Sequence, residues 1–398
     1  MLTDRHPEES VRAEVGHLDA IEALRAVALL WVVSFHYAVV RSRESADPWN
    51  AWIDATRPLE VVVRNGALGV DLFFLITGFL LVLPWARHAM EGRPAPRARD
   101  FYVRRIRRIV PAYYVQLAAL FFVLLPLLHG IGFVRSEAPY VGFNALAHGL
   151  FLHYTTPITS GSLELNGALW TLTLEAEFYL LLPLLAPLFV RAPWVTGLAL
   201  LALAALWRRL AATDLAPLVA LEMALGSTWS VPESAVRHLL LTQLPGYLGH
   251  FAAGMAIALV WLRRRAAVVT DRASFLWIAA LVAAAAVWYW AYGLAGGAKV
   301  GAEGLWLVTL ACFALVMLAL VRGGRFPAAL VATAPLLFLG RISYSAYLYH
   351  VPLLLLWNRF HILDGSAFSL PAYLATLIAL AAPSYHFVER PFMRRRPL

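Results

Sequence analysis

Ionisable side chains share one face of the first long apolar segment. The run RAVALLWVVSFH begins at Arg25 and ends at His36, and Glu22 lies three residues before the arginine. In a helix these three side chains project from the same side, with Arg25 and His36 about 16 Å apart along the axis. Ionisable groups at membrane depth face a cavity or a partner, so this face predicts a water-accessible interior in which a histidine can exchange protons. The alternative is an interfacial Glu22–Arg25 ion pair and a histidine that only ends the helix.

Two carboxylates elsewhere are candidates for the same interior. Asp71 stands near the start of the apolar run GVDLFFLITGFLL, where it either interacts with the helix N-terminus or reaches the polar face around His36. A later run, LWTLTLEAEFYLLLPLL, contains Glu175 and Glu177. Two positions along a helix turn by about 200°, so both glutamates cannot face one cavity. We favour Glu175, which is in register with Tyr179.

The most basic segment is RDFYVRRIRRIVPAYY. It holds Arg104, Arg105, Arg107 and Arg108, and Tyr113 follows at its end. Guanidinium groups bind phosphates through paired hydrogen bonds, and tyrosine rings can stack on a nucleobase. The segment therefore predicts a cytoplasmic site for a phosphorylated carrier. The alternative is a plain topological anchor made of positive charges on the cytoplasmic side.

A late apolar segment, LGRISYSAYLYHVP, contributes further polar side chains. It carries Arg341, Tyr344 and His350, and Trp170 begins the fourth apolar run; we predict that these four side chains contact a substrate. A lone membrane histidine is as often only hydrogen-bonded to a neighbouring helix. A third use, axial ligation of a haem by His36 and His350, is disfavoured because we expect no second histidine to face His36. We predict no metal site.

Composition places the chain in a lipid bilayer. Of its 398 residues 61% are hydrophobic and 14% are charged, and the mean hydropathy is +0.68. Soluble domains carry about a quarter charged residues. The net charge of +9 would suit nucleic acid, but the basic residues lie between apolar runs, which indicates membrane topology and no nucleic-acid partner. The single cysteine, Cys312, excludes an intrachain disulfide.

Ten apolar windows are long enough to cross a bilayer as helices, which takes about 20 residues each. We therefore predict an all-α, polytopic membrane fold in one domain over residues 18–393, between short tails at 1–17 and 394–398. An even number of crossings puts both termini on one side. That side carries 21 of the 33 basic residues against 10 on the other, so both termini are predicted to be cytoplasmic. The predicted spans lie near residues 20–40, 68–86, 110–128, 168–190, 194–212, 243–262, 274–293, 304–321, 335–357 and 370–388.

The longest connections all lie on the predicted outer side. Connections of this size on a small membrane protein are expected to fold back as lids or binding loops. They cover residues 41–67, 129–167 and 213–242.

Six of these stretches, taken in order, resemble the acyltransferase-3 family of bacterial membrane O-acyltransferases. The typical forms in the family are LDGLR…FH, GVDLFFVLSGFLI, FYLRRALRIYPAY, LWSLSVEEQFYLLWP, LGRISYSLYLWHFP and VERPF. This sequence has IEALRAVALLWVVSFH, GVDLFFLITGFLL, FYVRRIRRIVPAYY, LWTLTLEAEFYLLLP, LGRISYSAYLYHVP and FVERPF. The likeness runs from about residue 18 to 393. It departs at Glu22 for Asp, Ala23 for Gly, Thr77 for Ser, and Ala176 and Glu177 for Glu and Gln.

The resemblance implies a ten-helix enzyme of the bacterial cytoplasmic membrane that moves an acyl group from cytoplasmic acyl-CoA to a hydroxyl at or beyond the outer face. His36 aligns with the catalytic histidine of the family, and Arg25 aligns with the arginine eleven residues before it. We hypothesise that the arginine-rich motif binds the phosphates of acyl-CoA and that neutral His36 takes the proton of the acceptor hydroxyl. Glu22, Arg25, Asp71 and Glu175 are expected to assist. An acyl-histidine intermediate is the rival route.

The sequence leaves the acceptor open among a cell-envelope carbohydrate, a glycolipid and a secreted small molecule. Acetyl is the default acyl group, acyl-CoA is expected as a co-substrate, and no permanently bound cofactor is expected. A proton-coupled transporter that uses the Glu22, Arg25 and His36 face is the alternative from another class. Against it stand the dense cytoplasmic arginines and the lack of an internal repeat. The oligomeric state is left open.

Overall fold

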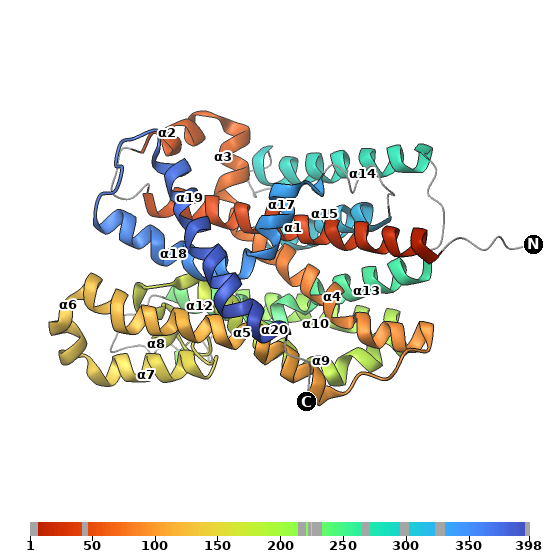
Figure 1. Cartoon of the computed structure of the whole chain (residues 1–398), viewed down its shortest axis with the longest axis horizontal. Coiled ribbons are helices and arrows are strands. Elements are labelled where there is room, and N and C mark those ends of the chain that lie inside the picture. The colour runs from red at the N-terminus through yellow and green to blue at the C-terminus, as the bar shows by residue number, and fades with distance from the viewer. Residues whose placement is uncertain are drawn as a thin grey trace, which may run out of the picture.

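The chain folds into a bundle of helices whose long members run roughly along one direction (Figure 1). The computed structural model describes residues 7–41, 47–213, 220–221, 224, 233–264, 271–294, 302–322 and 331–394. Within these ranges every regular element is helical, which confirms the all-α prediction. In Figure 1 the start of α1 lies at the right-hand end of the bundle, on the same side as the turn from α4 into α5.

Long helices form the body of the bundle, and shorter helices connect and cap them. The long helices are α1 (Pro7–Arg41), α4 (Gly69–Glu91), α5 (Ala98–Ala119), α9 (Trp170–Arg191), α10 (Pro193–Thr213), α13 (Leu244–Arg264), α14 (Asp271–Tyr289) and α15 (Ala302–Arg322). The shorter α-helices are α2 (Pro48–Ala55), α3 (Arg57–Arg64), α6 (Leu125–Ser136), α7 (Ala138–Gly149), α8 (Pro157–Ser160) and α12 (Glu233–Leu241). Single 3-10 or π turns are η1 (Gly66–Leu68), η2 (Leu120–Leu124), η3 (Ser162–Glu164), η4 (Gly167–Leu169) and η6 (Trp290–Leu294).

Eight helical segments among the described residues are long and apolar enough to cross a membrane, and the chain is a multi-pass membrane protein. They coincide with the first eight predicted spans, and the third is longer than predicted because η2 and α6 continue α5 without a break. The segments are Leu18–Arg41, Gly66–Glu91, Ala98–Ser136, Gly167–Arg191, Pro193–Thr213, Val236–Arg263, Ser274–Gly293 and Gly304–Arg322.

The ninth and tenth predicted spans are helical but interrupted, and neither is among these eight candidate segments of the described residues. The ninth breaks at Ile342, and its longer piece has 17 residues. The tenth begins with a helix of 15 residues and continues through a π-helical turn. Each longer piece is shorter than the roughly 20 residues that a straight crossing needs. The pieces are α17 (Ala334–Arg341), α18 (Ser343–Arg359), α19 (Ser369–Pro383), η7 (Ser384–Glu389) and α20 (Arg390–Arg394).

Glycines let two helices cross with their backbones in contact. A Cβ added at Gly78 of α4 would clash with the carbonyl oxygen of Phe251, and one at Gly254 of α13 would clash with that of Leu75. Small residues allow such close approach between membrane helices, where packing replaces the hydrophobic effect as the driving force. The α4–α13 pair is therefore a fixed unit at the centre of the bundle.

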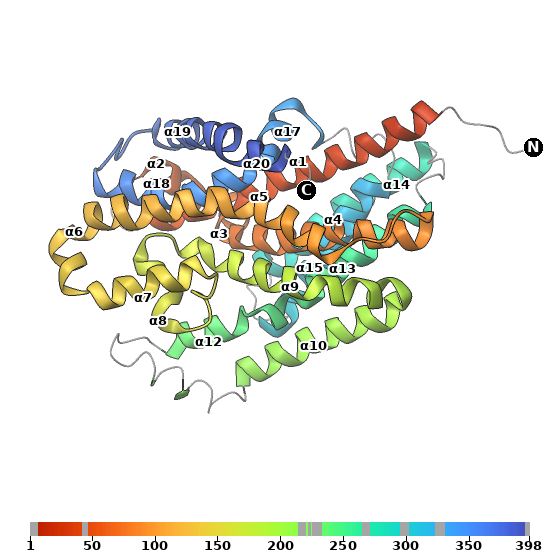
Figure 2. The ribbon, with the colours of Figure 1, turned by 60° about the horizontal axis from the view of Figure 1, so that its bottom comes forward.

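Two of the three connections predicted to fold back do so as helices. The first forms α2 and α3, which lie across one end of α1 (Figure 1). In the second, α6 turns back into α7 at the end of the bundle, as Figure 2 shows, and α8, η3 and η4 lead into α9. Most of the third, residues 213–242, lies outside the described residues apart from α12.

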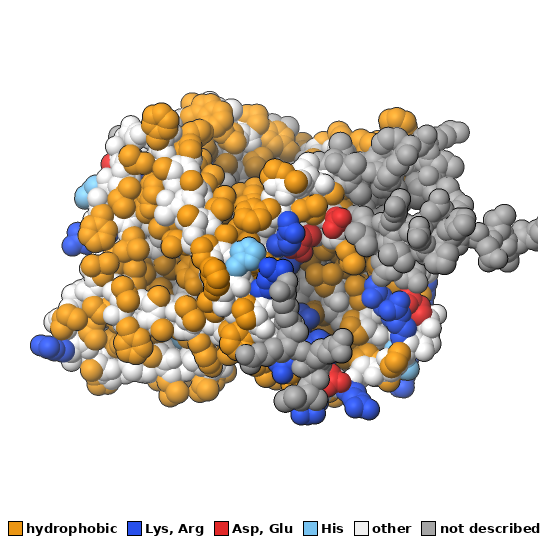
Figure 3. All heavy atoms as spheres, in the orientation of Figure 1, with side chains coloured by type: hydrophobic (Ala, Val, Ile, Leu, Met, Phe, Trp, Pro, Cys, Tyr) orange, Lys and Arg blue, Asp and Glu red, His pale blue; other side chains and the backbone are white. Residues whose placement is uncertain are grey.

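The surface fits a lipid environment. Hydrophobic side chains cover most of the face in Figure 3, and most of its charged side chains lie in the right-hand half. Large aromatic side chains such as Phe122, Trp194 and Phe387 are more than 70% exposed, which a bilayer tolerates and water does not. We call the end that holds residues 87–108 the arginine-rich end.

Candidate active site

A cavity of about 510 Å³ opens among α1, α4, α5, α9 and α18. Its volume falls within the range of roughly 300–1,000 Å³ that is usual for small-molecule sites. Five ionisable side chains predicted from the sequence to form the site or contact substrate meet in its walls, together with two arginines predicted to bind a phosphorylated carrier. These residues are Glu22, Arg25, Glu175, Arg341, Tyr344, Arg105 and Arg108.

The first helix brings an ion pair into this cavity. Arg25 Nη1 lies 3.3 Å from Glu22 Oε2, one helical turn away, and both side chains line the wall. The alternative ion pair is therefore present, and two of the three side chains of the predicted face line the cavity, whereas His36 does not. A guanidinium that retains a carboxylate partner can be held in place at membrane depth.

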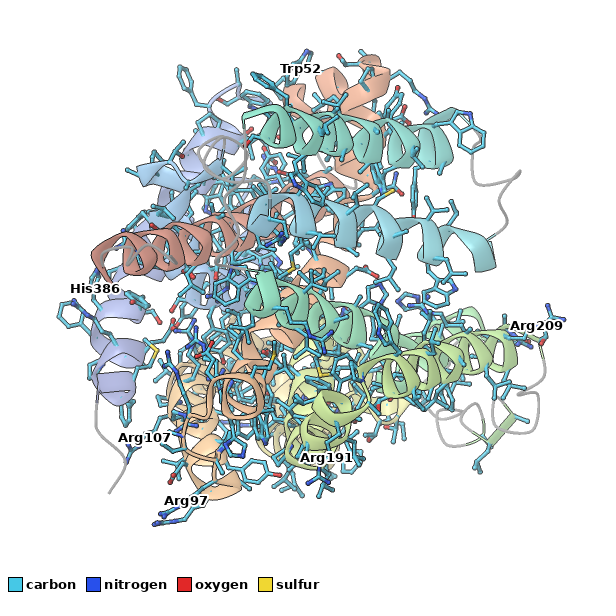
Figure 4. All side chains as sticks on the ribbon, turned by 90° about the vertical axis from the view of Figure 1, so that its right-hand side faces the viewer. Trp52, Arg97, Arg107, Arg191, Arg209 and His386 are labelled. Atoms are coloured by element: carbon cyan, nitrogen blue, oxygen red, sulfur yellow. The ribbon has the colours of Figure 1, made fainter. Side chains whose placement is uncertain are left out.

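The arginine segment divides between the cavity and the outside. Arg105 and Arg108 are three residues apart on one face of α5 and line the cavity. Arg104 is exposed, and Arg107 lies at the outer rim of the bundle, as Figure 4 shows. Arg105 packs its guanidinium 5.8 Å from the ring centre of Phe101. Two of the four predicted arginines thus face a ligand site.

Arg108 also contacts two residues of the C-terminal segment. Its Nη1 lies 2.9 Å from Met393 Sδ and 3.9 Å from Glu389 Oε2. Glu389 is fully buried and accepts a hydrogen bond from Ser345 of α18. We did not predict these partners, although Glu389 belongs to the closing FVERPF motif, which was the available signal.

Helical register places Glu175 as predicted. Thr171, Glu175 and Tyr179 of α9 all line the cavity, and Tyr179 donates a hydrogen bond to Glu175. Glu177 does not line it. The choice of Glu175, made from its helical register with Tyr179, was therefore correct.

The cavity runs lengthwise along α4. Its lining on this helix extends from Val70 to Leu81, a rise of about 16 Å. Arg341 at the arginine-rich end is exposed, whereas Val70 and Tyr347 at the other end are buried. The cavity is therefore polar where it opens and apolar where it closes.

Just beyond the closed end lie two histidines in contact. His36 of α1 and His350 of α18 have ring centres 4.9 Å apart, and His350 Nε2 lies 3.3 Å from His36 Nδ1. The Nδ1 atoms lie 2.9 Å and 2.6 Å from the backbone oxygens of Val32 and Tyr347, respectively. A carbonyl only accepts, so both Nδ1 atoms carry hydrogen. The single Nδ1 hydrogen of His36 is then shared between the Val32 carbonyl at 2.9 Å and His350 Nε2 at 3.3 Å, and the Nε2 lone pair of His36 is left for a reacting proton.

Our expectation that no histidine would face His36 was wrong. The sequence offered no local signal for it, because the two residues lie 314 positions apart. The contact does not favour haem, since the rings touch at 71° and leave no space between them for a porphyrin plane. No group of three or more His, Cys, Asp or Glu side chains in the described ranges is placed to hold a metal ion.

Tyr347 joins the cavity to the histidines. Its ring lines the closed end and lies 5.2 Å from the ring of His350, one helical turn further along α18. Its hydroxyl donates to the carbonyl of Ala168 at 3.0 Å. Neither His36 nor His350 lines the cavity itself.

Asp71 does not reach His36. It lies in the first turn of α4, and its Oδ1 is 2.9 Å from Nε2 of the buried His250 on α13. The helix N-terminal position was one of the two expected placements, but the partner, 179 positions away, was not foreseen. The prediction that Asp71 orients the catalytic ring is therefore wrong in this structure.

Two aromatic predictions also find other partners. Tyr113 is fully buried, donates to the carbonyl of His148 at 2.9 Å and stacks on Phe151, so its ring is not available to a nucleobase. Trp170 packs edge-on to Phe74 and does not line the cavity. Both side chains stabilise the bundle near the site.

A second polar cluster lies between α7 and α9, outside the membrane-spanning helices. His148 and His153 stack with ring centres 4.1 Å apart, and Ser162 Oγ lies 2.9 Å from His148 Nε2. Burial lowers the pKa of His148 to about 4. Burial, with repulsion from His148, lowers the pKa of His153 to about 3.

Acidification is expected to destabilise this cluster. In the unfolded chain histidine takes up a proton near pH 6.5, but the folded cluster resists protonation until about pH 4. The unfolded state therefore binds more protons between these values, and the free energy of unfolding falls by about 3 kcal/mol for His148 as the pH drops through this window. Tryptophan fluorescence melts of the detergent-purified protein from pH 7.5 to 3.5 measure this loss. His153→Phe, which keeps a ring against His148, should flatten the pH slope, and an unchanged slope would contradict the assignment.

Comparison with known proteins agrees with this geometry. The sequence profile described as Acyltransferase domain matches residues 18–386. The chain belongs to this acyltransferase family. The match covers nearly the whole cavity and the histidine pair, and it favours the enzyme over the transporter alternative.

Curated relatives of this acyltransferase are similar at low identity. Peptidoglycan O-acetyltransferase OatA of Listeria monocytogenes is 23% identical over 97% of this chain and 57% of its own length. Putative peptidoglycan O-acetyltransferase YrhL of Bacillus subtilis is 25% identical over 94% of this chain and 55% of its own. Nodulation protein 10 of Rhizobium leguminosarum is 30% identical over 44% of this chain and 46% of its own. The chain thus spans a little over half the length of the two peptidoglycan relatives. No solved structure matches it.

Proposed function

We propose that the chain is an O-acyltransferase of the bacterial cytoplasmic membrane that moves an acetyl group from cytoplasmic acyl-CoA to a hydroxyl of a cell-envelope carbohydrate. One observation carries the proposal. A cavity that opens among arginines runs about 16 Å along α4 and ends one helical turn from a histidine pair. This arrangement suits a donor with a phosphorylated head and a reactive group at the end of a long arm.

The open end suits the phosphates of acyl-CoA. Arg25, Arg105 and Arg108 line it, and guanidinium groups form paired hydrogen bonds with phosphate oxygens. The excess of basic residues in the loops at this end favours a cytoplasmic position for it, and the cytoplasm is where acyl-CoA is found. The apolar stretch between Leu81 and Val70 would then receive the pantetheine arm and deliver the thioester toward Tyr347.

The chemistry would be carried by His36. Its Nε2 takes the proton of the acceptor hydroxyl, and the oxygen attacks the thioester carbonyl. The new C–O bond forms as the C–S bond breaks, and the imidazolium returns its proton to the departing thiolate. In the rival route His36 Nε2 itself attacks the thioester carbonyl, so that a C–N bond forms as the C–S bond breaks and the thiolate leaves. The acceptor hydroxyl then attacks this acyl-histidine, forming the C–O bond as the C–N bond breaks and passing its proton to the imidazole.

His350 is proposed to position this ring. By sharing the His36 Nδ1–H with the Val32 carbonyl, it supports the tautomer that leaves Nε2 free to act as a base and helps to orient the ring. His350→Ala should lower kcat about tenfold, the worth of one such hydrogen bond, with KM for acyl-CoA unchanged. His350→Gln, whose amide oxygen can accept the same bond, should restore part of the loss. Equal kcat values for the Ala and Gln variants would argue against positioning and for a packing role.

The acceptor is proposed from the relatives. Two of them are named for O-acetylation of peptidoglycan, so a peptidoglycan hydroxyl is the first acceptor to test. Because those relatives are longer than this chain, a glycolipid or a secreted small molecule is kept in the same experiment.

The test uses purified protein in nanodiscs with acetyl-CoA labelled in the acetyl group. Release of free CoA and transfer of label to muropeptide, glycolipid or small-molecule hydroxyls are measured together. Thioester loss that depends on the protein supports the proposal, and label on one acceptor class identifies the substrate. An intact thioester in the presence of every acceptor would overturn it.

A further inference from the structure

Two aromatic side chains meet at the closed end of the cavity. Phe73 of α4 and Tyr347 of α18 both line it, with ring centres 6.0 Å apart in an edge-to-face arrangement. This is the usual contact geometry of aromatic pairs. No open passage therefore separates the two rings, and we call this pair the aromatic constriction.

The two rings are held differently. Tyr347 is buried, and its hydroxyl both donates to the Ala168 carbonyl and accepts from Thr171, each at 3.0 Å. Both partners belong to the chain at the start of α9, which fixes the tyrosine ring. Phe73 is only half-buried, and a phenyl ring has no polar atom to anchor it. Phe73 is therefore the member that can turn aside.

The reacting histidine lies beyond this constriction. His350 is one helical turn past Tyr347, and its ring contacts both the ring of Tyr347 and the ring of His36. A thioester that arrives along the cavity reaches the constriction before it reaches His36. The acyl group is the leading end of the donor, so it must pass between the two rings first.

We propose that Phe73 and Tyr347 select the acyl group by size, and that Phe73 sets the limit. This inference rests on the proposed function, because it assigns a specificity-determining role within the same donor site. Acetyl and propionyl groups pass the constriction with a small displacement of Phe73. Hexanoyl and longer chains would have to hold the ring aside along their length, and they are excluded.

A series of donors tests the proposal. Acetyl-, butyryl-, hexanoyl- and octanoyl-CoA are compared by kcat/KM for release of free CoA in nanodiscs. The wild-type value should fall steeply with chain length. Phe73→Ala should raise the ratio of hexanoyl to acetyl turnover by at least about tenfold, since a single methylene in an apolar site already changes specificity about tenfold or more. Phe73→Leu, a smaller change that keeps a large apolar side chain, should shift the ratio in the same direction and serves if the alanine variant does not fold.

Leu80→Ala is the matched control. Leu80 lines the same face of α4 two turns from Phe73, on the side of the arginines. Widening the cavity there should change kcat/KM for all donors by one common factor and leave the ratio unchanged. A ratio that rises equally in Leu80→Ala would overturn the assignment to the constriction.

The remaining outcomes separate this inference from the proposed function. Wild-type protein that cleaves acetyl- and hexanoyl-CoA equally well, or a Phe73→Ala ratio equal to wild type, rejects the size selection while the acyltransferase stands. Wild-type protein that cleaves none of the donors rejects the proposed function itself.

Discussion

His36→Ala is expected to lower acetyl transfer at least about a hundredfold without preventing folding or CoA binding. General acid–base catalysis by a positioned side chain contributes roughly 10²- to 10⁴-fold. The binding arginines lie at the other end of the cavity, so affinity for CoA should be unchanged. Transfer is measured with labelled acetyl-CoA, and affinity by calorimetry with CoA in the same nanodiscs.

His386→Ala is the control for this substitution. His386 is exposed on η7 and points away from the bundle in Figure 4. Its replacement should leave both transfer and affinity at wild-type values. Normal turnover in His36→Ala would remove this ring from the chemistry, and loss of CoA binding in the same variant would indicate misfolding instead.

The second large effect is expected at the mouth of the cavity. Replacing Arg105 and Arg108 together by Gln should raise KM for acetyl-CoA by about a hundredfold or more, with a smaller change in kcat. Hydrogen bonds to charged groups contribute about 1.5–3 kcal/mol each, which is roughly tenfold or more per arginine. The steady-state KM and its dependence on salt concentration measure the effect, because removal of phosphate contacts also weakens the salt dependence.

The neighbouring arginines provide a matched control. Arg104→Gln with Arg107→Gln removes the same charge from the same helix, but neither side chain lines the cavity. This pair should leave KM close to wild type. Equal losses in the two double variants would show that the segment acts through its general positive charge, which was the alternative drawn from the sequence.

Helical periodicity accounts for the parts of the site that the sequence predicted. Glu22 lies one helical turn before Arg25, and the register with Tyr179 selects Glu175 over Glu177; the structure confirms the ion pair and the choice of glutamate. Such predictions succeed because they depend only on residues within a few turns of one helix. The first eight spans succeed for the same reason, since length and apolar composition are local.

The parts that failed depend on which helices meet. Periodicity pairs Arg104 with Arg107 or Arg108 equally well, and only the packing of α5 decides that Arg105 and Arg108 face inward. Asp71 finds His250, and His36 finds His350, across 179 and 314 positions. No spacing rule reaches that far. Tyr113 was assigned to a nucleobase because it follows the arginine segment. Its true partner could not be predicted, because the His148 carbonyl is a backbone atom and leaves no mark in the sequence.

The glycine crossing of α4 and α13 bears on how a bulky donor enters. Because Gly78 and Gly254 put backbone against backbone, α4 cannot move closer to α13, although side chains that α4 points into the cavity, such as Phe73, can still turn. At the mouth of the cavity, by contrast, side-chain contacts of Arg108 with Glu389 and Met393 hold α5 against the C-terminal segment. An incoming phosphate competes for that same guanidinium. The donor therefore enters beside a fixed helix pair, α4 and α13, and its phosphates weaken the contacts between α5 and the C-terminal segment as they bind.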